Sequence, residues 1–170
     1  APILLDDVLL VTHNGYALRF NIEEVPVIGA KAAGVKAINL KGDDVVVSAF
    51  IANTKSIFIL TQRGSLKRMS VNDLPQAKRA GRGLQVLREL KAKPHRVFLA
   101  GPVFAENGGA ELDLFATEVE EKQQILQVQS QTGQVDEVNL TNLSLSERTS
   151  NGSFISDSIS DQGVFAARVK

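Results

Sequence analysis

The sequence repeats itself at a spacing of 49 residues, and this repeat restricts the folds that the chain can adopt. The stretch DVLLVTHNGYALRFNIEEVP, which begins at Asp7, aligns with SIFILTQRGSLKRMSVNDLP, which begins at Ser56. Five aligned pairs are identical: Thr12 and Thr61, Gly15 and Gly64, Arg19 and Arg68, Pro26 and Pro75, and Gly34 and Gly83. A fixed period of this length is typical of propeller blades or of a solenoid.

A third, fainter copy begins at Ile125 with ILQVQSQTGQVDEVNLTNLSLSERTSNG. It places Gly133 opposite Gly64 and Gly152 opposite Gly83, an offset of 69 residues. The longer offset predicts an insertion between the second and third copies. We place the insertion near residues 104–118, where the glycine-rich and acidic stretch AENGGAELD lies.

Each copy has the pattern of a β-hairpin, so the sequence predicts an all-β protein. VLLVT and IFILT are short apolar runs rich in branched residues, and HNG and QRG after them are turn sequences whose glycine supplies a positive φ. The first strand of the third copy, ILQVQSQ, alternates apolar and polar residues, whereas the other two are apolar throughout. Alternation indicates a strand with one solvated face, so the third unit should be the more exposed one.

A helix competes with a strand directly after Gly83. In GLQVLRELKAK, leucines recur every three residues, as on one side of a helix. The aligned stretch of the first copy, GVKAINLKGDD, contains Gly42 and fits a helix poorly. The repeat therefore favours a strand here, and a helix of three turns or more across 83–93 would contradict it.

The charge of the chain is unevenly distributed although 19 basic and 19 acidic residues cancel. Residues 62–96 hold ten basic and two acidic residues, whereas residues 106–147 hold nine acidic residues and one lysine. One interpretation is that the basic segment meets a polyanion; the other is that the two segments face each other. There is no cysteine, which suits a reducing compartment, and no apolar run approaches the roughly 20 residues of a membrane span.

The second copy carries the most specific pattern: a strand, a T-x-x-G turn, LKRMSV, an acidic turn, a proline and then KRAGRGL. This pattern resembles the C-terminal domain of the A subunit of bacterial type IIA topoisomerases. The family's gyrase members carry a Q-R-R-G-G-K-G box, for which KRAGRG is a degenerate relative, so the resemblance is closer to the topoisomerase IV branch.

The resemblance implies a β-pinwheel, with about three four-stranded blades in this chain. Blade one would take up about residues 1–52, blade two about 53–103, and blade three, with its insertion, about 104–170. We expect the chain to be a fragment of a longer protein. The partners implied are duplex DNA, the ATPase subunit of the enzyme and the remainder of the A subunit, with no membrane, in a cytoplasmic and nucleoid-associated location.

Members of this family bend duplex DNA around a basic rim, and the loop that carries much of the charge maps onto QAKRAGRG. The candidate DNA contacts are Lys31, Arg63, Lys67, Arg68, Lys78, Arg79 and Arg82. Arg79 and Arg82 are the strongest candidates for DNA contact, because nearby glycines let the backbone approach a phosphate closely. Lys67 and Arg68 are weaker candidates, since one of two adjacent strand residues normally faces inward. Asp136 and Glu137 replace that pair in the third copy, which makes a DNA role for blade three doubtful. The acidic segment 106–121 should face away from DNA or touch another part of the enzyme.

Catalytic chemistry is poorly represented in the sequence. It holds no H-x-x-x-H or H-E-x-x-H pairing, no G-x-S-x-G elbow and no Walker loop. The family's catalytic tyrosine lies in another part of the enzyme, and Tyr16 matches a strand position instead. We predict a chain without catalytic residues, cofactor or metal, within a parent enzyme that hydrolyses ATP. A propeller-like module that binds a protein or a small ligand, with no DNA role, is the alternative.

Overall fold

The computed structural model describes residues 6–104 and 123–170. Their strands and single α-helix are β1 (Asp7–Thr12), β2 (Tyr16–Asn21), β3 (Val46–Ile51), β4 (Ser56–Thr61), β5 (Ser65–Ser70), β6 (Leu84–Gln85), β7 (Val97–Val103), β8 (Ile125–Ser130), β9 (Val135–Asn139), β10 (Ser153–Phe154), α1 (Asp157–Gln162) and β11 (Val164–Val169). A short 3-10 turn follows each hairpin, at Ile22–Glu24, Val71–Asp73 and Leu140–Asn142.

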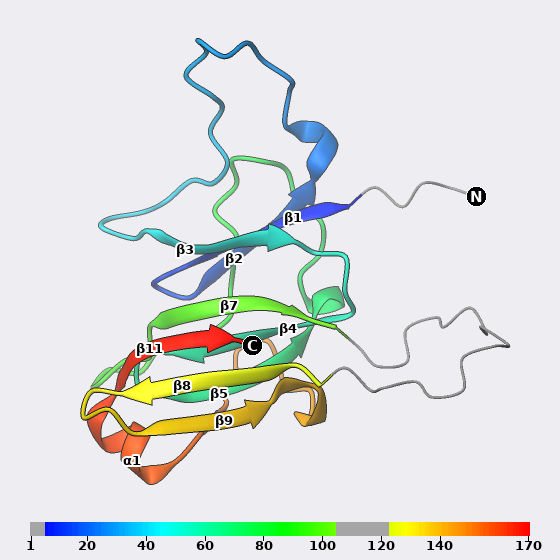
Figure 1. Cartoon of the computed structure of the whole chain (residues 1–170). Helices are drawn as coiled ribbons and strands as arrows, with labels where there is room; N and C mark the ends of the chain where they lie inside the picture. Colours follow the sequence, from blue (N-terminus) through cyan, green and yellow to red (C-terminus); the bar gives the residue numbers. More distant parts are fainter. Residues whose placement is uncertain (1–5, 105–122) are drawn as a thin grey trace, which may run out of the picture.

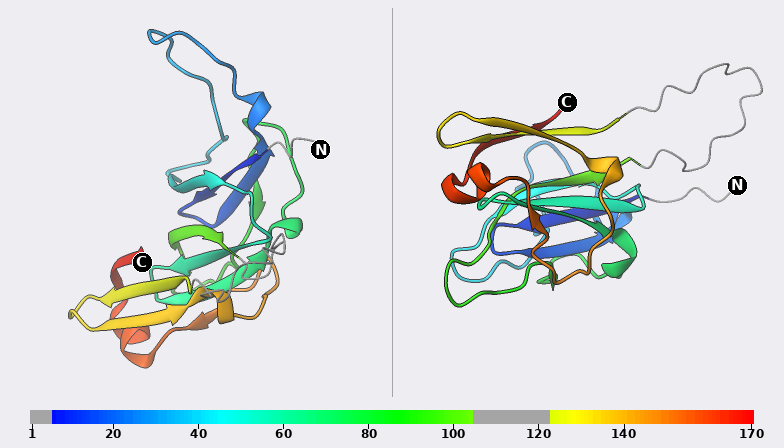
Figure 2. Two further views of the ribbon diagram at one scale, coloured as in Figure 1. Left: turned by 45° about the vertical axis from the view of Figure 1, so that its right-hand side comes forward. Right: turned by 90° about the horizontal axis from the view of Figure 1, so that it is seen from below.

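The strands form three antiparallel sheets that are stacked in chain order (Figure 1, Figure 2). The first sheet has the order β3-β1-β2-β6, the second β10-β5-β4-β7 and the third β11-β8-β9. The prediction of an all-β fold is confirmed. Within the described residues two sheets have four strands and the third has three.

Two apolar layers join the sheets, and β4 contributes to both. Ile57 and Ile59 belong to the cluster that packs against the first sheet, whereas Phe58 and Leu60 belong to the cluster that packs against the third. Because β4 is covered on both faces, all its residues are buried. Burial alternates along β8 instead, so the prediction that the third unit is the more exposed one is confirmed.

The hairpin turns lie where the repeat places them. Gly15, Gly64 and Gly133 have φ values of +87°, +83° and +92°, a conformation that residues with a side chain rarely adopt. Each turn therefore needs its glycine, and the turn predictions are confirmed.

Strands are exchanged between consecutive units, which the repeat did not indicate. β6 follows the second hairpin in the chain but pairs with β2 in the first sheet, and β10 pairs with β5 in the second. A glycine precedes each exchanged strand at close contact: a Cβ at Gly83 would lie 2.5 Å from the carbonyl oxygen of Ala17, and one at Gly152 would lie 2.3 Å from that of Leu66. The sequence repeat therefore divides the chain at 1–52, 53–103 and 104–170, but each of the first two sheets takes one strand from the following range.

The segment after Gly83 forms the two-residue strand β6 and then a loop that reaches β7 at Val97. The helix alternative across 83–93 is thus not observed, and the strand is shorter than the repeat suggested. The structure does not describe residues 105–122. The acidic segment 106–121 and all of the predicted insertion near 104–118 except residue 104 therefore lie outside the described residues. In the part of the chain that the structure describes, no helix is long and apolar enough to cross a membrane.

Candidate nucleic-acid interface

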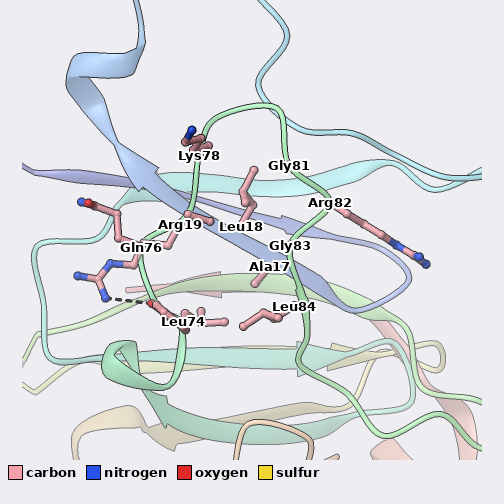
Figure 3. Close-up of a pocket in the computed structure, with 12 residues that line it drawn as sticks. Ala17, Leu18, Arg19, Leu74, Gln76, Lys78, Gly81, Arg82, Gly83 and Leu84 are labelled. Carbon is pink, nitrogen blue, oxygen red and sulfur yellow. Dashed lines mark hydrogen bonds between the residues drawn. The ribbon is translucent and has the colours of Figure 1, made fainter.

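The loop at residues 75–84 carries the KRAGRG stretch and lies over the edge of the first sheet (Figure 3). It begins after the 3-10 turn Val71–Asp73 of the second unit and ends in β6. The Ala77 N–H donates to the carbonyl of Arg19 at 2.8 Å, which fixes the first half of the loop against β2. Pairing of β6 with β2 fixes the second half.

Lys78 and Arg82 are exposed on this loop. None of the ion pairs among the described residues involves either side chain. The Arg82 guanidinium lies 4.6 Å from the ring centroid of Tyr16 and donates to its hydroxyl at 3.1 Å. A cation over an aromatic face keeps its charge at the surface, so both residues present positive charge to solvent.

Arg79 is half-buried and braces the loop. Its Nε donates to the carbonyl of Glu24 at 2.8 Å, and its backbone N–H donates to the Glu24 carboxylate at 3.1 Å. A further nitrogen donates to the carbonyl of Lys36 at 2.5 Å. Arg79 therefore ties the loop at 75–84 to the loop between β2 and β3, and two of the five N–H donors of its guanidinium are used inside the protein.

Lys67 is buried, with 2 % of its surface exposed. Its ammonium donates to the carbonyl of Val86 and to those of Glu147, Arg148 and Ser150, the last two at 2.6 Å. Burial lowers the pKa of Lys67 to about 7, and the nearby charge of Arg148 acts in the same direction. The ammonium is enclosed by backbone of the second and third units and is not available at the surface.

Arg68 is also engaged inside the protein. Its Nε donates to the Ser56 hydroxyl at 2.8 Å, and another nitrogen donates to the carbonyls of Thr141 and Leu143 at 2.9 and 3.2 Å. These carbonyls belong to the 3-10 turn of the third unit and its cap. Arg68 thus joins the second sheet to the following unit.

Arg19, which aligns with Arg68, does the same one unit earlier. It pairs with the Asp7 carboxylate at 2.6 Å and donates to the carbonyls of Val71 and Leu74 at 3.3 and 3.0 Å. The repeated arginine is therefore a contact between units in both copies.

Arg63 lies at the hairpin turn of the second unit. It donates to the carbonyl of Lys93 at 2.7 Å, contacts Nε2 of His95 at 3.2 Å, and its guanidinium lies 5.4 Å from the Phe154 ring centroid. Burial lowers the pKa of His95, and the charge of Arg63 lowers it further. The ring is therefore held neutral beside the arginine, whose side chain remains half exposed.

Lys31 is exposed on the long loop between β2 and β3. Three further cations, Arg88, Lys91 and Lys93, are exposed on the loop between β6 and β7 and were not among the predicted contacts. The high positive charge of residues 62–96 pointed to them, but the resemblance mapped the family's basic loop onto QAKRAGRG, which ends before them.

The acidic pair of the third unit makes local contacts. Asp136 accepts from the Ser156 hydroxyl at 2.9 Å, and Glu137 pairs with Lys170. The hydrogen bond from Lys170 lowers the pKa of Glu137. Neither residue occupies the position between units that Lys67 and Arg68 occupy in the second sheet.

Comparison with known proteins places the chain in a family. The family model described as "DNA gyrase C-terminal domain, beta-propeller" matches residues 6–53 and 55–103. The chain belongs to this family. The resemblance found in the sequence is thereby confirmed, and the stacked sheets described above are those of a β-pinwheel.

Two relatives are named as A subunits of DNA topoisomerase 4. The chain is 67 % identical to the A subunit of this enzyme from Streptococcus pneumoniae over 98 % of its own length, and 42 % identical to that from Bacillus subtilis over 88 %. It spans only about a fifth of the length of these relatives.

Solved structures give the same result. The chain matches the C-terminal domain of DNA topoisomerase IV with a TM-score of 0.80 and 34 % identity, covering 97 % of this chain and 46 % of that one. It matches a DNA gyrase A C-terminal domain with a TM-score of 0.73 and 16 % identity, covering 98 % of this chain and 51 % of that one, which shows a shared fold.

Proposed function

We propose that this chain is a non-catalytic DNA-binding module, part of the A subunit of a topoisomerase IV, and that it holds duplex DNA by its phosphates. The observation that carries the proposal is the exposure of Lys78 and Arg82, without acidic partners among the described residues, on the loop at 75–84. Cations that displace the counterions of DNA bind it without reading its sequence.

The proposed surface differs from the predicted set of seven residues. Lys31 and Arg63 remain in it, and Arg88, Lys91 and Lys93 join it, because their side chains reach solvent. Lys67 and Arg68 are left out, since their donors are used inside the protein. Arg79 adds to the local positive potential but acts mainly as a brace.

Within the parent enzyme, the module would bend duplex DNA and position it for strand passage, and so support decatenation and supercoil relaxation. Its partners would be the ATPase subunit of topoisomerase IV and the rest of the A subunit, in the cytoplasm at the nucleoid. The family membership and the 67 % identity to the Streptococcus pneumoniae relative support this assignment.

A salt titration of DNA binding tests the proposal. We expect the chain to bind a labelled duplex in fluorescence anisotropy, with log K falling linearly as log salt rises. The double variant Lys78→Gln/Arg82→Gln should bind every duplex more weakly. Its slope should be shallower by about 0.9 for each phosphate contact that is lost.

The matched control is Lys55→Gln/Arg168→Gln, which removes two exposed cations that lie outside the loops at 22–45 and 75–96. Its slope should stay close to that of the unchanged protein. If the control and the loop variant reduce the slope equally, the loop is not the DNA surface. If the unchanged chain does not bind DNA at all, the alternative of a protein- or ligand-binding module takes precedence.

A further inference from the structure

A hollow of about 300 Å³ lies between β2 and the loop at residues 75–84 (Figure 3). Leu84 is exposed at its mouth, and the nearly fully buried Ala17, Leu18 and Leu74 form its apolar floor. Pockets for small molecules are typically clefts of about 300–1,000 Å³ with mostly apolar walls and a few polar groups. The hollow has the composition of such a site and the size of a small one.

The charge around the hollow is positive. Lys78 and Arg82 line it and are exposed, whereas the Arg19 guanidinium beside it is engaged by Asp7 and by two backbone carbonyls. Arg82 is held over Tyr16 and points away from the loop (Figure 3). Lys78 is therefore the cation best placed to pair with an anionic group at the rim, and Arg82 strengthens the local potential.

The second sheet carries a matching loop, and there the space beneath the loop is occupied. The loop at residues 144–153 lies over β5 as the loop at 75–84 lies over β2, and Lys67 fills the position that aligns with Leu18. The Lys67 ammonium reaches the loop carbonyls of Arg148 and Ser150. Leu18 is two bonds shorter, has no donor and packs in an apolar cluster, so no side chain of β2 reaches up from this position to bind the loop carbonyls.

We propose that this hollow binds a small molecule that combines one or two rings with a carboxylate or a sulfonate. The rings would pack against Pro75 and Leu84, which line the hollow and are exposed, and the anionic group would meet the Lys78 ammonium. This site requires no DNA, and it would exist on the chain whether or not the loop also contacts phosphates.

The probe for this site is 8-anilinonaphthalene-1-sulfonate, an aromatic anion, added to the ¹⁵N-labelled chain of 170 residues. We expect saturable shifts of backbone amide signals, concentrated at residues 17–19 and 74–84, with a Kd of about 1 mM or tighter. N-phenyl-1-naphthylamine has the same rings without the sulfonate and should bind at least about threefold more weakly, because Lys78 then has no anionic partner.

Two variants locate the site. Ala77→Phe places a ring on a residue that lines the hollow and should weaken binding of the sulfonate about tenfold or more. Ala92→Phe adds the same ring to an exposed alanine elsewhere and should leave the affinity unchanged. Lys78→Gln should weaken binding of the sulfonate while the neutral probe binds as before, and this arm stands even if Ala77→Phe fails to fold.

Amide shifts spread over another face, or equal affinity of Ala77→Phe and Ala92→Phe, would overturn the location. Equal affinity of the two probes for the unchanged chain would overturn the anionic part of the proposal. A titration that does not saturate would overturn the site altogether.

Discussion

The two loops that cover sheet edges, at residues 75–84 and 144–153, follow the same course but are held from beneath in different ways. Each is followed by an exchanged strand, β6 or β10, and each contacts its sheet by an isolated parallel bridge. Beneath the first loop lies Leu18, which packs in an apolar cluster; beneath the second lies Lys67, which binds carbonyls. A lysine next to a basic loop can thus be a structural element of the fold, and the same backbone course does not require it.

Replacing Lys67 with leucine would make the second loop resemble the first, and we expect this change to have the largest effect. The carbonyls of Val86, Arg148 and Ser150 would lose their donor in a buried place, at a cost of about 4 kcal/mol in the free energy of unfolding. Urea unfolding followed by circular dichroism measures the loss. Lys55→Leu, at an exposed lysine, is the control. A loss below about 1 kcal/mol for Lys67→Leu would show that the loop needs no ammonium.

The repeated arginines sharpen the comparison between units. Arg19→Met should lower the free energy of unfolding by about 3 kcal/mol, and Arg68→Met by about 2 kcal/mol. Each arginine leaves two backbone carbonyls without their donor. The difference arises because Arg19 also leaves the Asp7 carboxylate, whose side chain is 6 % exposed, whereas Arg68 also leaves the neutral Ser56 hydroxyl. Adding Asp7→Asn to Arg19→Met should recover part of the loss. Equal losses for the two arginines, without recovery, would contradict this account.

The smallest effect we expect concerns pH. Burial lowers the pKa of Lys67 to about 7 from a value near 10.5 in the unfolded chain, so between these values the unfolded state binds more protons. The contribution of Lys67 to stability should therefore rise as pH increases from about 7 towards 10, although the carbonyl partners, which favour the protonated form, reduce the rise. The difference in unfolding free energy between the unchanged chain and Lys67→Leu, measured at pH 7 and pH 9.5, gives its sign. A difference that stays constant over this interval would mean that the ammonium stays charged throughout.

Much of the fold could be predicted because hairpins are local. Apolar runs and turn glycines such as Gly15 and Gly64 lie within a few residues of the strands that they join, so the repeat predicts them directly. The exchange of β6 into the first sheet could not be predicted in this way. It pairs Leu84 with Ala17 across a long stretch of chain, and a period identifies equivalent segments without saying which sheet each joins.

The candidate site was harder to predict because the sequence around a basic residue does not show whether its side chain binds a ligand or the protein itself. Lys67 and Arg68 are adjacent in β5, and alternation along a strand warned that one of them would face inward. In the structure both side chains donate hydrogen bonds inside the protein, because backbone carbonyls of the third unit lie within reach of each. Those carbonyls come from residues more than 70 positions later, which no local pattern around Lys67 reveals.

The strand exchange also has a consequence for synthesis on the ribosome. β2 is complete at Asn21, but the strand that closes its free edge, β6, does not emerge until residues 84 and 85 have been made. At about 5–20 residues per second, the edge of the first sheet stays open for roughly 3 to 12 s. During that interval it is a template for pairing with another chain. The first and second units are thus exposed to misassembly until the following unit has been translated.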